Sequence, residues 1–269
     1  MATSETTSPY QKPASANSQA QIEYRVGKRQ VTWVGPLTVM TARSIFMIVA
    51  QALVAALYLL RGHPSAWNAA APWWTVYGTL VDVGCLALML KFTRSEGIRL
   101  RDLIGQLRLR WGHDLLLGMG CFIAFLVCFT FPGLLAGKLV FGSAHPAMYP
   151  GMLAERTLPS WAVIYSFCIW WLIWSPTEEM TYNGYALPRI HALTGRKSVA
   201  VLLVGFCWAL QHCFLPFILD WRYVVWRFLF FLPGVLVASL IYLRIRRLSP
   251  LILAHWPMDL MAAILTVKL

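Results

Sequence analysis

Glu178 and Glu179 are adjacent carboxylates inside a long apolar stretch, and they are the residues of this chain best suited to chemistry. Residues 161–174 carry no charge, and after the pair no charged side chain follows until Arg189. On insertion scales, one Asp at the centre of a membrane helix costs about 2.5–3.5 kcal/mol. Two carboxylates at such a place indicate a functional site, in which a glutamate could act as a general base.

Three further ionisable residues, His212, His255 and Asp259, lie deep inside later apolar segments. At a helix rise of about 1.5 Å per residue, Glu179, His212 and His255 each lie roughly 12–15 Å from an Arg that marks a membrane surface. This common depth predicts that three helices bring the groups together near the middle of the membrane. His255 and Asp259 share a helix face, whereas Glu178 and Glu179 point about 100° apart, so one can face a site while the other supports it.

These residue types fit more than one chemistry. Hydrolysis requires water, a base and a donor that faces the developing negative charge. Two His and one carboxylate, here Glu178, His212 and His255, are also a known zinc ligand set. The same groups could instead hold helices together or relay protons, so the residues alone leave the function open.

The composition is that of a membrane protein. The chain is 58% hydrophobic and only 13% charged, against roughly 25% charged residues in soluble domains. Its net charge of +12 indicates contact with anionic lipids rather than nucleic acid. The six cysteines lie in apolar runs without a C-x-x-C pair, so we expect no disulfide framework and no cysteine-based metal site.

The apolar segments predict an all-α bundle of about seven (seven to eight) transmembrane helices, because each approaches the roughly 20 residues that cross about 30 Å of hydrocarbon. Leu and Ile at helical spacing in residues 95–112, interleaved with Arg, predict a short amphipathic helix on the membrane surface. Residues 1–30 should form a disordered polar tail, residues 31–160 the N-terminal spans with the amphipathic helix, and residues 161–269 the helices of the candidate site. The predicted spans are 41–60, 74–92, 115–139, 161–187, 198–219, 225–243 and 250–267.

The distribution of basic residues predicts the orientation. With seven spans, most of the 23 Lys and Arg fall on the side of the N-terminus, Arg43 and Arg189 among them. The positive-inside rule then places the N-terminus in the cytoplasm. We expect a multi-pass protein of the plasma (inner) membrane. Asp82, in the second span, is a further buried carboxylate to which the sequence assigns no role.

Three segments resemble, in order, the motifs of the CPBP family, which comprises intramembrane CAAX proteases and bacteriocin-processing (Abi) proteins. They are E-E-M-T-Y-N-G from Glu178, W-A-L-Q-H ending at His212, and H-W-P-M-D from His255. The family patterns are E-E-x-x-x-R, F-x-x-x-H and H-x-x-x-N/B on successive helices. The chain departs from them at three positions, and the loss of the Arg removes a fixed positive charge near the glutamates. Asn183 replaces the usual Arg, Trp208 the usual Phe, and Asp259 the common Asn.

The resemblance implies an intramembrane endopeptidase in which a glutamate activates water. Glu178 would be the general base, helped by His212, and Glu179 would support and orient the site. His255 and Asp259 correspond to the pair that stabilises the oxyanion. Because an ionised Asp repels an oxyanion, Asp259 would act by orienting His255.

The resemblance also bears on cofactors and partners. It favours no obligatory cofactor, with zinc held by Glu178, His212 and His255 as the alternative. The expected partners are the lipid bilayer and a peptide or protein substrate, which could be lipidated. A non-catalytic membrane interaction or immunity protein of the same fold is the other alternative, and the substitution at Asn183 keeps it open.

Overall fold

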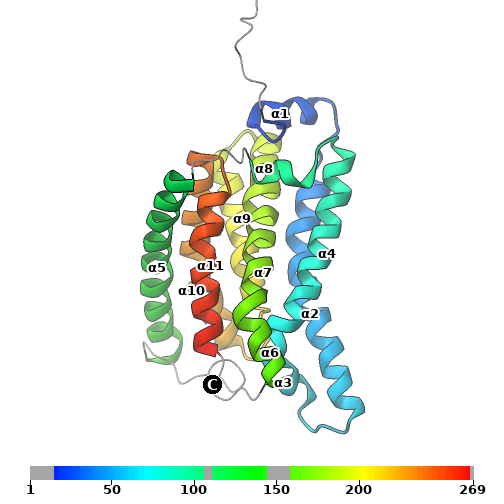
Figure 1. Ribbon diagram of the computed structural model, residues 1–269, viewed down its shortest axis with the longest axis vertical. Coiled ribbons are helices and arrows are strands. Elements are labelled where there is room, and N and C mark those ends of the chain that lie inside the picture. Colours follow the sequence, from blue (N-terminus) through cyan, green and yellow to red (C-terminus); the bar gives the residue numbers. More distant parts are fainter. Residues whose placement is uncertain (1–14, 106–110, 144–157, 267–269) are drawn as a thin grey trace, which may run out of the picture.

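The computed structural model describes residues 15–105, 111–143 and 158–266, and in these residues the chain forms helices without a strand (Figure 1). Long helices run side by side along the molecule, with α5 at one edge and α2 and α4 at the other. The prediction of an all-α bundle is confirmed. The long helices outside the centre are α2 (Val34–Leu60), α4 (Trp74–Ser95), α5 (Trp111–Phe141), α10 (Trp221–Ile245) and α11 (Ser249–Thr266), while α3 (Ala66–Ala70) and η1 (Ala71–Trp73) are short.

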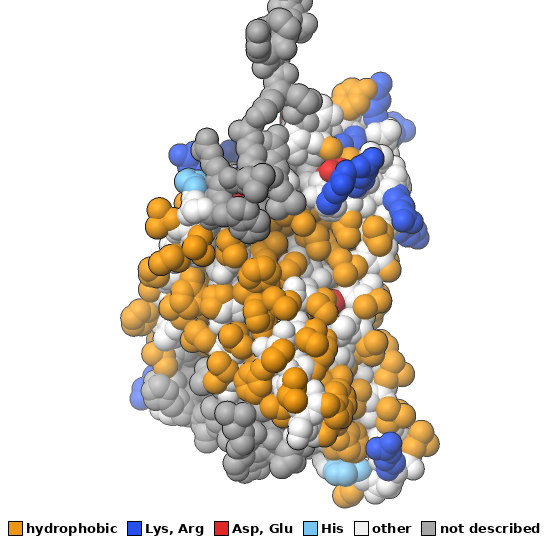
Figure 2. Space-filling model, viewed as in Figure 1, with side chains coloured by type: hydrophobic (Ala, Val, Ile, Leu, Met, Phe, Trp, Pro, Cys, Tyr) orange, Lys and Arg blue, Asp and Glu red, His pale blue; other side chains and the backbone are white. Residues whose placement is uncertain are grey.

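The surface of the bundle is that of an integral membrane protein. Hydrophobic side chains cover the middle of the face in Figure 2, and Lys and Arg side chains lie towards its two ends. Within the described residues, four helices are long and apolar enough to cross a membrane. The count of seven to eight spans remains a prediction. The four helices are Val34–Leu60, Ala66–Ser95, Gly112–Phe141 and Trp221–Ile245.

A central helical column carries the two glutamates. Residues 160–194 stay helical throughout, although the helix widens twice into π-helical turns, which in proteins are often found at functional sites. The column contacts α1, α2, α4, α9 and α11, so Glu178 and Glu179 lie at the centre of the bundle. Its parts are α6 (Ser160–Tyr165), η3 (Ser166–Trp170), α7 (Trp171–Glu179), η4 (Met180–Ala186) and α8 (Leu187–Thr194).

Helix α9 (Lys197–His212) ends at His212 rather than at residue 219 as predicted. Pro216 lies within the segment that follows, and proline cannot continue a helix interior. Gln51 of α2 holds this segment, because its side chain donates to the Phe217 carbonyl at 2.9 Å and accepts from the Phe217 amide at 2.7 Å. The depth of His212 was calculated along a continuous helix to Arg222, the Arg taken to mark the membrane surface, so that calculation was wrong.

The prediction of a disordered tail is wrong for residues 15–30. Here the chain forms α1 (Gln19–Gly27), which packs on α8 with Ile22 fully buried. Just before α1, the Asn17 amide donates to the Gly184 carbonyl at 2.9 Å. One apolar anchor and side-chain hydrogen bonds thus order a segment that is polar in composition. Residues 1–14 lie outside the described residues.

The predicted amphipathic α-helix is also wrong for the part of it that the structure describes. Residues 100–103 form only the 3-10 turn η2 (Leu100–Leu103), in which the Arg99 amide donates to Asp102 at 2.9 Å and Leu103 is buried. Gly105 follows with a φ of 90°, a conformation that ends a helix. Residues 106–110 lie outside the described residues, and α5 begins at Trp111.

Candidate active site

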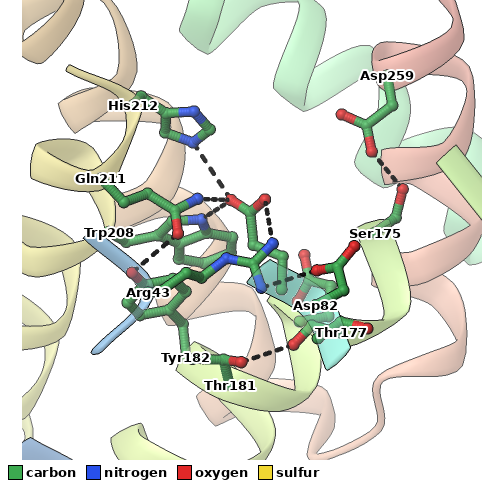
Figure 3. Close-up of polar contacts among 12 residues, drawn as sticks. Arg43, Asp82, Ser175, Thr177, Thr181, Tyr182, Trp208, Gln211, His212 and Asp259 are labelled. Carbon is green, nitrogen blue, oxygen red and sulfur yellow. Dashed lines mark hydrogen bonds and ion pairs between the residues drawn. The ribbon is translucent and has the colours of Figure 1, made fainter. Parts of the chain in front are cut away.

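The Glu178 carboxylate is fully buried and receives three side chains of α9 at one oxygen. Gln211 donates to Oε1 at 2.7 Å, the Trp208 indole N–H donates to the same atom, and His212 Nε2 lies 3.2 Å from it. Gln211 and His212 follow Trp208 by three and four positions, so both lie on the side of α9 that carries Trp208. Figure 3 shows them side by side. Helix α9 therefore fixes Oε1 and leaves Oε2 to other partners.

Glu179 faces a different helix, as the expected angle between neighbouring residues requires. Its Oε1 lies 3.2 Å from His255 Nδ1 on α11, and its Oε2 accepts a hydrogen bond of 2.8 Å from Asn183. Asn183 lies four residues after Glu179 on the same column. At the position where the family has Arg, this chain thus has a neutral donor that binds Glu179.

His255 lies between two carboxylates. Glu179 is at its Nδ1, and Asp259 Oδ1 is 3.7 Å from its Nε2. The second oxygen of Asp259 accepts a hydrogen bond of 2.5 Å from Ser175, which lies on α7 one turn before Glu179 (Figure 3). The structure therefore brings all five candidate residues into one cluster from α7, α9 and α11. Their catalytic roles remain predictions.

Two residues that the sequence analysis set aside also belong to the cluster. Arg43 of α2 is fully buried, with Nη1 3.0 Å from Asp82 Oδ1 on α4 and Nη2 3.7 Å from Glu178 Oε2. Counting Arg43 as a marker of the cytoplasmic surface was wrong. Because α2 begins at Val34, Arg43 lies about 13 Å along the helix from its start. The sequence feature that could have predicted this ion pair is a single Arg and a single Asp in consecutive apolar segments.

Gln211 was missed because it stands between the residues that define its motif. Besides donating to Glu178, it accepts a hydrogen bond of 3.0 Å from the Tyr182 hydroxyl. The Tyr182 ring stacks on Trp208 with centroids 5.0 Å apart and planes 8° from parallel. Tyr182 thus orients two of the donors to Glu178, one by a hydrogen bond and the other by ring contact.

The described residues do not fit the zinc set of the sequence analysis. In that part of the chain, no three His, Cys, Asp or Glu side chains are grouped so that they could hold a metal ion. His255 contacts Glu179 rather than Glu178, and so it stands apart from the Glu178–His212 pair. Zinc dependence remains an alternative to be tested, and the steps proposed below use only groups of the chain.

Residues 159–261 match the family model described as type II CAAX prenyl endopeptidase Rce1-like. The resemblance to the CPBP family is confirmed. The matched segment contains Glu178, Glu179, His212, His255 and Asp259, whereas Arg43 and Asp82 lie outside it. It supports a CAAX protease-like membrane enzyme. No curated protein and no solved structure matches the chain.

Proposed function

We propose that this protein is an intramembrane endopeptidase in which Glu178 activates water. The observation that carries the proposal is the unequal use of its two carboxylate oxygens. Oε1 is held by the α9 side chains, while Oε2 has no hydrogen-bond partner among the described residues. The Arg43 guanidinium lies 3.7 Å from Oε2, beyond hydrogen-bond distance. A carboxylate that is fixed at one oxygen and has no hydrogen bond at the other can take a proton from a bound water in a defined direction.

His255 supplies the donor for the developing negative charge. Its Nδ1 is engaged by Glu179, and its Nε2 is 3.7 Å from Asp259, which is too long for a hydrogen bond. Since the Glu179 carboxylate accepts, Nδ1 donates to it, and Nε2 carries a second N–H only when the ring is protonated. In this imidazolium form the Nε2 N–H is available to a peptide carbonyl oxygen, while Asp259 nearby favours the charged ring. Since Ser175 holds Asp259, the ring orientation is supported from α7.

The proposed reaction has two steps. Glu178 Oε2 takes a proton from water as the hydroxide oxygen bonds to the peptide carbonyl carbon, and His255 donates to the oxyanion that forms. The C–N bond then breaks, and the proton held by Glu178 passes to the leaving amine. The products are a new carboxylate and a free amine. His212, beside Oε1, helps to hold Glu178 in its productive orientation.

We further propose that the N-terminus of the protein lies in the cytoplasm. We also propose that the substrate is a membrane-associated peptide, in the first instance one with a prenylated C-terminus. A site inside a bundle with an apolar surface favours a substrate that already partitions into the bilayer. The test is to reconstitute the purified protein in vesicles and add a farnesylated C-terminal peptide or the same peptide without the lipid. Mass spectrometry should find cleavage of the farnesylated peptide at the higher rate. Folded protein that cleaves neither peptide would count against this substrate class.

A non-catalytic role is the second candidate, and one observation favours it. Both glutamates are completely buried, and three of their four oxygens have hydrogen-bond partners in the chain, while the fourth lies in an ion pair with Arg43. Such a cluster could serve only to hold α7, α9 and α11 together. The two functions differ in whether a variant that keeps the fold but has lost the Glu178 carboxylate still performs the biological task.

A further inference from the structure

Arg43 and Asp82 form a buried ion pair that touches the candidate site from outside the family segment. Both side chains are fully buried, and Nη1 of Arg43 lies 3.0 Å from Asp82 Oδ1. Figure 3 shows the guanidinium between Asp82 and the side chains of the site. A buried charge pair is costly to form, and pairs of this kind add little stability on balance. Stability alone therefore gives a weak reason for Arg and Asp at these positions.

The geometry of the guanidinium points to Glu178. Nη2 is 3.7 Å from Glu178 Oε2, the oxygen that we propose takes the proton from water. The guanidinium also lies over the Trp174 ring, with its carbon 4.1 Å from the ring centroid. Trp174 precedes Glu178 by one turn of α7, so the ring supports the cation next to the carboxylate. The guanidinium is thus in contact with Asp82, Trp174 and Glu178 at once.

We infer that Arg43, held by Asp82, is a positioning residue that keeps Glu178 Oε2 oriented and balances its charge. The inference rests on the proposed function. Arg43 is the close partner of Glu178 that is always charged, because Trp208 and Gln211 are neutral donors and His212 is charged only when it is protonated. Asn183 does not meet this need, since it is neutral and binds Glu179. A residue of α2 thus supplies the positive charge that the motif on α7 lacks, while Asp82 limits the net charge buried in the bundle.

The test requires a variant that removes the cation without leaving Asp82 unpaired. Arg43→Met alone would strand Asp82, and breaking a buried pair in this way is strongly destabilising. The informative variant is therefore Arg43→Met/Asp82→Asn. We expect a KM close to that of the wild type and a kcat reduced about 100-fold, as misplacement of a catalytic group typically produces. The melting temperature should be lower than that of the wild type, because Glu178 loses its cation.

Two single variants complete the set. Arg43→Lys keeps the charge but cannot reach Asp82 and Glu178 together, so kcat should fall about 10-fold with KM unchanged. Asp82→Asn keeps the guanidinium at Glu178 and should lose less activity than the double variant. A double variant with wild-type kcat would overturn the inference. If the double variant does not fold, Arg43→Lys decides, because a wild-type kcat in that variant would also overturn it.

A failure of the proposed function is recognised separately. If the wild type cleaves no peptide, thermal unfolding still tests the contact between Arg43 and Glu178. Glu178→Gln, Arg43→Met/Asp82→Asn and their combination should shift the melting temperature by amounts that do not add, because the two sites are coupled. Additive shifts would overturn the inference whether or not the protein is a protease.

Discussion

Replacement of Trp208 by Phe tests how firmly α9 holds the general base. The Trp208 indole N–H donates to Glu178 Oε1, and its ring stacks on Tyr182. Phe keeps an aromatic ring in the stack but removes the N–H. A hydrogen bond to a charged group contributes about 1.5–3 kcal/mol to stability, so the free energy of unfolding should fall by about that amount. For a chain of this size this corresponds to a melting temperature lower by roughly 3–12 °C.

Trp170→Phe is the matched control. Trp170 is as buried as Trp208, yet its indole nitrogen has no hydrogen-bond partner among the described residues. The control therefore includes the loss of ring volume but not the loss of a hydrogen bond. Both variants are unfolded in the same detergent at one scan rate, and cleavage is measured below the transition. Equal melting temperatures for Trp208→Phe and Trp170→Phe would refute the argument that this hydrogen bond holds Glu178. We expect kcat of Trp208→Phe to fall as well, since Oε1 retains only Gln211 and His212.

Three other variants test separate contacts. Asp259→Asn should retain or raise kcat, because an amide can still accept from Ser175, and complete loss of cleavage with a preserved fold would contradict the role given to Asp259. Arg189→Ala should lower the free energy of unfolding in chemical denaturation by about 3–5 kcal/mol, because it leaves Glu96 buried without the partner now 2.5 Å away. Burial lowers the pKa of His191, which lies beyond the predicted span. As pH falls, the unfolded state therefore takes up a proton at a higher pH than the folded state does. The free energy of unfolding should decline as pH falls below about 6.5. His191→Gln should remove this contribution to the pH dependence, and an unchanged dependence would contradict it.

Most of the helical architecture followed from the distribution of apolar residues. Segments that are apolar over about 20 residues have few ways to satisfy their backbone other than as helices, and α2, α4, α5, α10 and α11 formed where they were predicted. The early end of α9 was not predicted, because the composition stays apolar up to Leu219. What ends the helix is Pro216 together with Gln51, a residue far away in the sequence. Long-range contacts of this kind do not appear in local periodicity.

The candidate site was predictable in part for the same reason. Glu178, His212 and His255 stood out because each is an ionisable residue in an apolar helix, and their expected proximity was found. Arg43 escaped because it lies near the start of its apolar segment, where an Arg usually marks the membrane surface. Its pairing with Asp82 is a contact between two helices, and the sequence did not show which faces of those helices meet.

The most direct test of the proposed mechanism is the cleavage rate of Glu178→Gln. Gln keeps the size of the side chain and an oxygen that can accept from Trp208 and Gln211, but it cannot take a proton from water. We expect kcat to fall by about 10²–10⁴-fold, the usual contribution of general base catalysis, while the melting temperature stays near that of the wild type. Glu23→Gln, which neutralises an exposed glutamate on α1, should leave kcat unchanged. A folded Glu178→Gln protein that cleaves peptide at the wild-type rate would show that Glu178 is not the general base.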